Sequence, residues 1–238
     1  MMMSSGNGTV VERKPAHKNR VKGLIDEPKT GKERVTITAP KIKTIKIKII
    51  GTAPYLQCRF AAKAIAKIMT KQQAGSTATK GKKASHPPRD YDDDFKGAIH
   101  KSADGWYGIP ATAFRQAAIS ACRLVNFKAT LAKLSIFIDA EGYDEVDSTP
   151  LVRIDSKPEK HVMMGRNSDM NRTPDVRVRA IYKKWSATLT VRFDEDQFHT
   201  ADVVNLFMRI GQQVGVGEGR PDSRNSAGMG LGTFDVQL

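Results

Sequence analysis

The sequence predicts an α+β fold in which single helices alternate with antiparallel strands. Three observations support this prediction. Lysine alternates with isoleucine or threonine near residue 41, apolar residues recur at three- and four-residue spacing in three later segments, and short alternating runs fill the second half. Alternation is typical of a strand with one buried face, and the longer spacing is typical of an amphipathic helix. Such a mixture favours α+β architecture.

The composition is that of an ordinary globular protein. Of 238 residues, 39% are apolar and 27% are charged. We expect no membrane segment, because no apolar run approaches the roughly eighteen residues that span a bilayer. The basic, polar start does not look like a signal peptide, so we expect a cytoplasmic protein. Cys58 and Cys122 lack metal-site spacing and are predicted to be buried thiols.

The first half is predicted to hold a tail, a strand and a helix. Residues 1–34 resemble a basic, disordered tail. Residues 41–51, KIKTIKIKIIG, predict a strand with one apolar and one basic face. Residues 55–73 predict a helix on which Arg59, Lys63, Lys67 and Lys71 form a basic stripe. A basic loop follows at 74–90.

A second helix is predicted within 106–125, WYGIPATAFRQAAISACRLV. Ile109 precedes a proline and is therefore expected to be extended. Thr112 is the expected N-cap. One apolar stripe is predicted from Phe114, Ala117, Ala118, Ala121, Leu124 and Val125.

The remaining elements complete a ferredoxin-like order. Strands are predicted at 132–140, 150–154, 175–182, 185–193 and 232–238. The strands at 175–182 and 185–193 form a pair joined by a turn at Lys183-Lys184. Thr200 is expected to cap a helix that ends near Gln213. Single helices among antiparallel strands favour a ferredoxin-like arrangement with insertions at about 74–105 and 141–174.

The net charge points to a polyanionic partner. It is +14, with a pI near 9.8, and proteins of this kind most often bind nucleic acid. Residues 1–50 hold twelve Lys/Arg against four Asp/Glu, and residues 59–83 hold seven Lys/Arg and no acid. Basic residues therefore occur within predicted elements and not only in the tail.

The segment 215–234, GVGEGRPDSRNSAGMGLGTF, is unusual before a final strand. Glycine permits positive φ and close approach to the backbone. Consecutive N–H groups in such a loop can hold an anion, and Arg220 and Arg224 offer forked donors suited to phosphate. A Walker-type phosphate loop is excluded, because the Gly-Lys-Ser/Thr ending and the following helix are missing.

This loop resembles the glycine-rich loop of the RAMP superfamily, the repeat-associated proteins of CRISPR systems. The segment WYGIPATAFRQAAISACR is similar to the Ile-Pro segment and helix start of the backbone subunits in those complexes. Those subunits typically carry Gly-Ser-Ser after the proline, where this chain has Ala111-Thr112-Ala113. The resemblance covers roughly 40–238 and implies one RAMP-like domain over 35–238 with a modified RRM-like fold.

The resemblance also implies a function. Single-stranded nucleic acid would run along a basic groove, and copies would stack side by side on it as a homo-oligomer or filament, together with other subunits of a ribonucleoprotein complex. RNA is favoured and DNA is an option. The residues predicted to bind it are Arg59, Lys63, Arg115, Gly215, Gly217, Gly219, Arg220, Arg224, Gly228, Gly230, Gly232, Trp106 and Tyr107. Tyr55 is a further candidate for stacking on bases.

No enzymatic activity, cofactor or metal is predicted. The five histidines, which include His100 and His161, have no partner at a fixed sequence spacing. Asp90, Asp92, Asp93 and Asp94 could hold Mg²⁺, but a solvated acidic turn that starts a helix is the simpler interpretation.

Three alternatives remain open. The first is a phage-type protein that binds and anneals single-stranded DNA on the same fold. The second is a RAMP-type endoribonuclease that depends on His100 or His161. The third is a structural protein whose glycine-rich loop contacts only protein.

Overall fold

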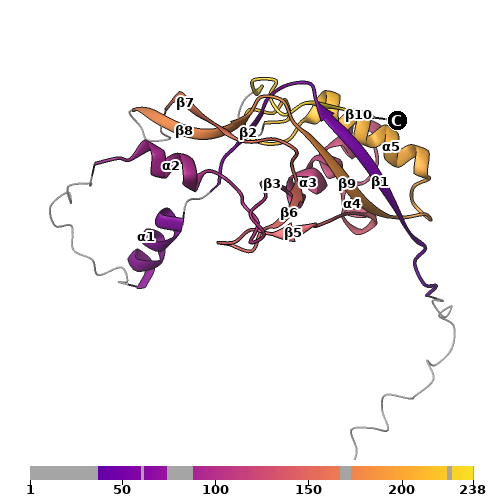
Figure 1. The fold of residues 1–238 in the computed structure, drawn as a ribbon. Coiled ribbons are helices and arrows are strands. Elements are labelled where there is room, and N and C mark those ends of the chain that lie inside the picture. The colour runs from indigo at the N-terminus through magenta and orange to yellow at the C-terminus, as the bar shows by residue number, and fades with distance from the viewer. Residues whose placement is uncertain (1–36, 60–61, 74–87, 167–172, 224–226, 238) are drawn as a thin grey trace, which may run out of the picture. The chain divides into compact units, whose positions relative to one another are not determined.

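A computed structural model of the chain describes residues 37–59, 62–73, 88–166, 173–223 and 227–237. Its contacts divide the chain into two units, Met1–Ala39 and Pro40–Leu238. Every described helix and strand belongs to the second unit (Figure 1). The predicted tail at 1–34 lies outside the described residues, as do parts of the two predicted insertions.

The helices are interspersed with strands along the chain (Figure 1). They are α1 (Ala62–Gln73), α2 (Tyr91–Gly97), α3 (Ala111–Ala121), α4 (Ala129–Ser135) and α5 (Thr200–Arg209), with a 3₁₀ turn η2 (Cys122–Val125) after α3 and a π-helical turn η3 (Ile210–Val214) after α5. The strands are β1 (Ile42–Gly51), β2 (Tyr55–Gln57), β3 (Gly108–Pro110), β4 (Ile136–Asp139), β5 (Gly142–Tyr143), β6 (Pro150–Arg153), β7 (Glu159–Arg166), β8 (Pro174–Tyr182), β9 (Ser186–Asp194) and β10 (Phe234–Gln237).

The largest sheet has the order β10-β1-β9-β4, with all pairs antiparallel. Its strands and two helices follow one another in the chain as β1, α3, β4, β9, α5 and β10. Ile47 and Ile49 of β1 are buried, whereas Lys46 and Lys48, which alternate with them, are exposed. The predicted strand with one apolar and one basic face is therefore confirmed.

Two three-stranded antiparallel sheets complete the described unit. One has the order β2-β8-β7 and the other β3-β6-β5. An isolated bridge between Ile154 and Ala187 links the end of β6 to β9. The described chain is thus a mixed α/β protein with antiparallel sheets.

The core lies between the helices and the inner face of the largest sheet. The alanine-rich helix α3 packs against β4 and also contacts α5. The buried side chains of the two helices and η3 include Phe114, Ala117, Ala118, Ala121, Val203, Leu206, Phe207 and Ile210. None of the helices in the described ranges is long and apolar enough to cross a membrane.

Several predicted boundaries are wrong because tertiary pairing overrides local pattern. Residues 55–57 form β2 and not the start of a helix, since they pair with β8. Residues 132–135 end α4, so the following strand is only Ile136–Asp139. Pro110 is the N-cap of α3 in place of Thr112.

The pairing of the later strands also differs from the prediction. The strands predicted at 175–182 and 185–193 exist but belong to different sheets, so Lys183-Lys184 joins two sheets and is not a hairpin turn. The long strand β7 falls in the predicted insertion at 141–174, for which only the strand at 150–154 was predicted. Leu124 and Val125 are exposed in η2, and Cys58 is exposed, whereas Cys122 is buried as predicted.

Candidate functional site

A cleft of about 690 Å³ lies where the glycine-rich loop faces α3 and β2. The two sequence segments that carry the family resemblance, 106–123 and 215–234, therefore meet at one place. The lining residues are Tyr55, Gln57, Cys58, His100, Pro110, Thr112, Ala113, Gln116, Ala117, Ser120, Arg123, Val216, Gly217, Glu218, Arg220 and Asp222.

Hydrogen bonds fold the glycine-rich loop back on itself. The Val216 N–H donates to the Gly232 carbonyl at 2.9 Å, and the Met229 N–H donates to the Gly219 carbonyl at 2.7 Å. The Gly232 N–H in turn donates to the Pro54 carbonyl at 2.8 Å. The six loop glycines all have positive φ, so the backbone follows a path that other residues rarely adopt. The described parts of the loop are a folded structure and not a loose connector.

Residues with unpaired backbone donors line the cleft from two elements. Gly217 of the loop lines it, and its N–H donates no hydrogen bond within the described part of the chain. Thr112 and Ala113 also line it, in the first turn of α3, which has Pro110 as its N-cap, no side-chain cap and no acid. The first N–H groups of a helix lack intrahelical partners and carry positive partial charge. This arrangement is suited to an anionic group in the cleft.

The charged side chains of the cleft are held by specific partners. Arg220 Nη1 donates to the Gly217 carbonyl at 3.1 Å. Arg123 Nη2 donates to both carboxylate oxygens of Asp222, at 3.0 and 3.1 Å. Glu218 forms an ion pair with Arg179, whose pKa is raised because hydrogen bonds to Glu218 outweigh its burial. Both Arg123 and Arg220 are therefore positioned along the cleft before any ligand arrives.

A second depression of about 530 Å³ continues from the cleft along α3. Its charged lining residues are Arg115, Arg123 and Lys133, with no acid among them. Arg115 Nη2 donates to the Lys133 carbonyl at 2.6 Å, and the guanidinium lies 5.0 Å from the centre of the Phe137 ring. The residues common to both depressions are Thr112, Gln116, Ser120 and Arg123. One ridge of α3 thus joins the cleft to a cationic groove.

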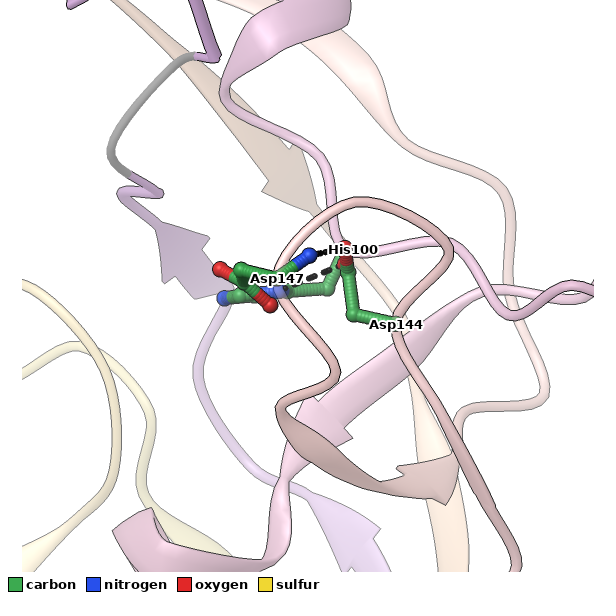
Figure 2. A group of neighbouring side chains, drawn as sticks. All are labelled: His100, Asp144 and Asp147. Atoms are coloured by element: carbon green, nitrogen blue, oxygen red, sulfur yellow. Dashed lines mark hydrogen bonds and ion pairs between the residues drawn. The ribbon is translucent and has the colours of Figure 1, made fainter. Parts of the chain in front are cut away.

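His100 contributes a buried imidazole to the same cleft. It is only 6% exposed, and its Nδ1 lies 2.9 Å from Asp144 Oδ2 (Figure 2). Within the described residues its Nε2 has no hydrogen-bond partner. Burial lowers the pKa of His100, although Asp144 opposes that shift. A neutral imidazole with Nδ1–H donated to Asp144 leaves the Nε2 lone pair available.

Asp144 is the centre of this buried network. Its Oδ1 accepts from two turn N–H groups, those of Val146 and Asp147, and forms an ion pair with Arg59 Nη2 at 3.1 Å. Its Oδ2 accepts from the Lys101 N–H at 3.3 Å as well as contacting His100. Four hydrogen bonds and one ion pair therefore fix the carboxylate and, through it, the orientation of the His100 ring.

The same network resembles a metal-ligand set. Ligand atoms of His100, Asp144 and Asp147 lie within 4.8 Å of one another (Figure 2). However, Arg59 contacts both carboxylates, at 3.1 Å for Asp144 and 3.7 Å for Asp147. Its guanidinium already supplies the positive charge that a metal ion would bring, so the donor set fits an ion-paired network better than a metal site.

The aspartates at 90–94 also have structural partners. Asp90 caps α2 by accepting from the N–H groups of Asp92 and Asp93. Asp94 pairs with Arg89, and Asp92 pairs with Lys160. These contacts match the simpler interpretation, an acidic turn that starts a helix.

The predicted binding residues lie at several places. Gly217 and Arg220 line the cleft, and Arg115 lines the adjoining groove. Arg59 contacts Asp144, with its side chain only 6% exposed. Trp106 and Tyr107 line a different depression. Tyr55 lines the cleft but is buried against Tyr182 and Trp185. Lys63 belongs to α1, but its side chain and all of Arg224 lie outside the described residues.

Sequence reasoning missed Arg123 and Lys133 as members of this region, and it named His100 only beside His161, for the endoribonuclease alternative. Arg123 had a usable signal, since Thr112, Gln116 and Ser120 precede it at three- and four-residue spacing and mark one polar face of α3. No sequence signal distinguished His100 from His161, because the partner of His100, Asp144, is 44 residues away. A comparison with models of known protein families finds no match. No curated protein matches the chain either.

Proposed function

We propose that the protein binds single-stranded nucleic acid through the cleft and the adjoining groove. One observation carries the proposal: backbone N–H groups of the glycine-rich loop and the uncapped start of α3 meet in a cleft that continues into a groove lined by Arg115, Arg123 and Lys133. Phosphates accept from backbone amides, helix N-termini and arginine. Contacts of this kind bind without strong sequence preference.

The size of the path suits several nucleotides. The shared ridge runs from Thr112 to Arg123, and eleven residues of helix rise about 16 Å. One strand of stacked nucleic acid rises about 3.4 Å per nucleotide. The ridge therefore spans about five nucleotides per copy of the protein.

The topology supports the finer fold proposal. The chain order β1, α3, β4, β9, α5, β10 is a β-α-β-β-α-β arrangement in one antiparallel sheet, which is the ferredoxin-like pattern. We therefore infer a modified RRM-like fold. With the RAMP resemblance, this favours RNA as the strand and a homo-oligomer that coats it in a CRISPR-like assembly.

The salt dependence of binding tests the site. On a single strand, each phosphate that the protein neutralises adds about 0.7 to the steepness of log affinity against log salt. Arg123→Ala and Arg220→Ala should each flatten the slope by that amount for a 20-nucleotide strand, and the double variant should flatten it by about 1.4. Arg209→Ala, an exposed arginine of α5 that does not line the cleft, is the matched control.

The same experiment separates the alternatives. An unchanged slope in the double variant, with an unchanged unfolding midpoint, would refute the cleft as the binding site. Tighter binding of oligo(dT) than of oligo(U), with annealing of complementary strands, would favour the DNA-annealing alternative. Retention of neither strand would favour a loop that contacts protein. The number of copies per strand, measured by sedimentation as the strand lengthens, tests the oligomer.

The His100–Asp144 pair favours a second candidate function, cleavage of the bound RNA. His100 Nε2 at the cleft is suited to accept the proton of a ribose 2′-hydroxyl. The 2′ oxygen would then bond to phosphorus as the bond to the 5′ oxygen breaks, and water would protonate the leaving oxygen. Asp144 would hold the imidazole in the tautomer required. Arg123 and Arg220, which line the same cleft, would stabilise charge on the phosphorane.

RNA incubated with EDTA tests this second function. Cleavage should yield 2′,3′-cyclic phosphate ends, should be absent on DNA, and should be abolished in His100→Gln while persisting in His161→Gln. His161 belongs to β7 and does not line the cleft, so it is the control histidine. Intact RNA after long incubation of the wild-type protein would exclude the cleavage function and leave the binding function standing.

A further inference from the structure

A third depression, of about 620 Å³, is separate from the cleft. It shares no lining residue with the cleft or the groove. Its volume is within the range of small-molecule sites, about 300–1,000 Å³. The lining residues are Asp104, Gly105, Trp106, Tyr107, Arg153, Ile154, Asp155, Ser156 and Lys157.

Trp106 has an indole supported from the sheet side. A Cβ added at Gly142 would lie 2.7 Å from a carbon of its six-membered ring, and one added at Gly108 would lie 3.1 Å from another. The two glycines therefore let the ring rest against the backbone of β3 and β5. Trp106 is half-buried, and its indole N–H donates no hydrogen bond within the described residues. The ring is therefore packed on one side, and its donor is available to a ligand.

The charges around the ring are mixed and partly unpaired. Arg153 and Lys157 are exposed and form no ion pair at contact distance within the described part of the chain, although burial raises the pKa of nearby Glu141 and the Arg153 cation opposes that shift. Asp104 and Asp155 supply carboxylates on the same lining. A continuous phosphate backbone would be repelled by the two carboxylates of this lining. A single nucleotide matches all of its groups: the phosphate pairs with the cations, exocyclic amino groups of the base donate to the carboxylates, and the base stacks on the aromatic rings.

We propose that this Trp106 pocket binds one nucleotide, with the base against the indole and the phosphate at Arg153 and Lys157. The nucleotide is either free in solution or an unstacked unit of the strand held in the cleft. Only the second source rests on the proposed function.

Tryptophan fluorescence gives a direct test with nucleoside monophosphates. The chain has two tryptophans, and the other, Trp185, is 3% exposed with its N–H donated to the Ala53 carbonyl. Quenching by a ligand thus reports Trp106. Titration with AMP, GMP, CMP and UMP should give saturable quenching by at least one of them. Arg153→Ala and Lys157→Ala should each weaken that affinity at least tenfold, whereas Lys184→Ala, another exposed cation, should not.

Equilibrium dialysis of the labelled nucleotide provides a readout that does not depend on the fluorophore. Trp106→Ala should abolish retention while keeping cooperative unfolding, and Trp106→Phe should retain binding because its ring still stacks. Linear quenching by all four nucleotides, or equal retention by the wild-type protein and Trp106→Ala, would overturn the proposal. If Trp106→Ala does not fold, the nucleotide affinities of Arg153→Ala and Lys157→Ala test the proposal in its place.

Two further arms identify the source of the nucleotide. Competition by a 20-nucleotide strand would assign the pocket to an unstacked unit of that strand, and simultaneous binding would assign it to a free nucleotide. In Arg123→Ala/Arg220→Ala, strand binding should fall while mononucleotide quenching persists. This variant therefore distinguishes an error in the proposed strand-binding cleft from an error in the proposed nucleotide-binding Trp106 pocket.

Discussion

Gly230 and Gly232 form a matched pair that tests how the glycine-rich loop is held. Both have positive φ, +72° and +67°. A Cβ at Gly230 would meet nothing within 4 Å, whereas one at Gly232 would lie 1.7 Å from the Val216 carbonyl oxygen. Replacement by alanine therefore strains the backbone equally at the two positions but forces the chain apart at only one.

The expected losses of stability differ several-fold. An L-residue in the left-handed region costs about 1–2 kcal/mol, and the reduced entropy of the unfolded chain offsets about 0.4–1 kcal/mol of that. Gly230→Ala should cost about 1 kcal/mol. Gly232→Ala also disrupts the hydrogen bonds of Val216 N–H to Gly232 and of Gly232 N–H to Pro54. A buried group left unpaired costs about 1–3 kcal/mol, so the total should exceed about 3 kcal/mol.

Urea unfolding followed by circular dichroism measures both losses. The slope m should stay constant, so that shifts in midpoint report stability. In thermal unfolding, Gly230→Ala should lower Tm by about 2–4 °C and Gly232→Ala by more than about 6 °C. Equal losses for the two variants would refute the close approach of Gly232 to Val216. Abolished strand binding in Gly230→Ala would show that flexibility, and not fixed geometry, serves the ligand.

Three further predictions concern the buried network and the cysteines. Burial lowers the pKa of His100 in the folded protein below its ordinary value of 6.5. The neutral imidazole therefore contributes its full stability above pH 6.5, and that stability is lost as the pH falls through the folded pKa. The urea midpoint should drop less between pH 7.5 and 5.5 in His100→Gln than in the wild-type protein. Arg59→Ala removes the guanidinium that pairs with the fully buried Asp144 side chain and should lower the free energy of unfolding by about 3–5 kcal/mol. The slope of log affinity against log salt should not change. A flattened slope would instead identify Arg59 as a phosphate contact. A thiol reagent should rapidly modify one of the two cysteines of the native protein, because Cys58 is exposed whereas Cys122 is buried. Partial desolvation nevertheless raises the pKa of the Cys58 thiol, so the reaction, which needs the thiolate, should accelerate as the pH rises. Rapid modification of both cysteines would contradict this packing.

Strong periodicity made the longer elements predictable. The alternation of lysine and isoleucine in β1 and the apolar stripe of α5 both lead to the elements found. β2 was missed because three residues are too short to show a period, and Leu56 continues the spacing of the helix after it. The separation of β8 from β9 depends on which partner strand each finds, and no local pattern records that choice.

The candidate site was predictable in its parts but not in its assembly. Composition identified the glycine-rich loop, and the Ile-Pro segment identified the start of α3. That both line one cleft follows from the position of β2 beside them, with the Glu218 N–H donating to the Leu56 carbonyl at 2.9 Å. The role of Arg59 was predicted from exposure on a helical stripe, but the residue precedes α1 and turns inward toward Asp144. The sequence around Arg59 alone does not show that its guanidinium is buried in an ion pair, because the partner Asp144 is far away in the sequence.

The position of β1 in the largest sheet has a consequence for synthesis of the protein. β1 pairs with β9 on one side and β10 on the other, and about 180 residues separate β1 from β10. A ribosome adds about 5–20 residues per second, so roughly 10–35 s pass between the synthesis of β1 and the synthesis of β10. Both edges of β1 are unpaired until β9 has been made, and one edge stays unpaired until β10 follows, so its isoleucine-rich face and its edges are open to other chains. The nascent protein is therefore expected to depend on chaperones more than the mature fold would suggest.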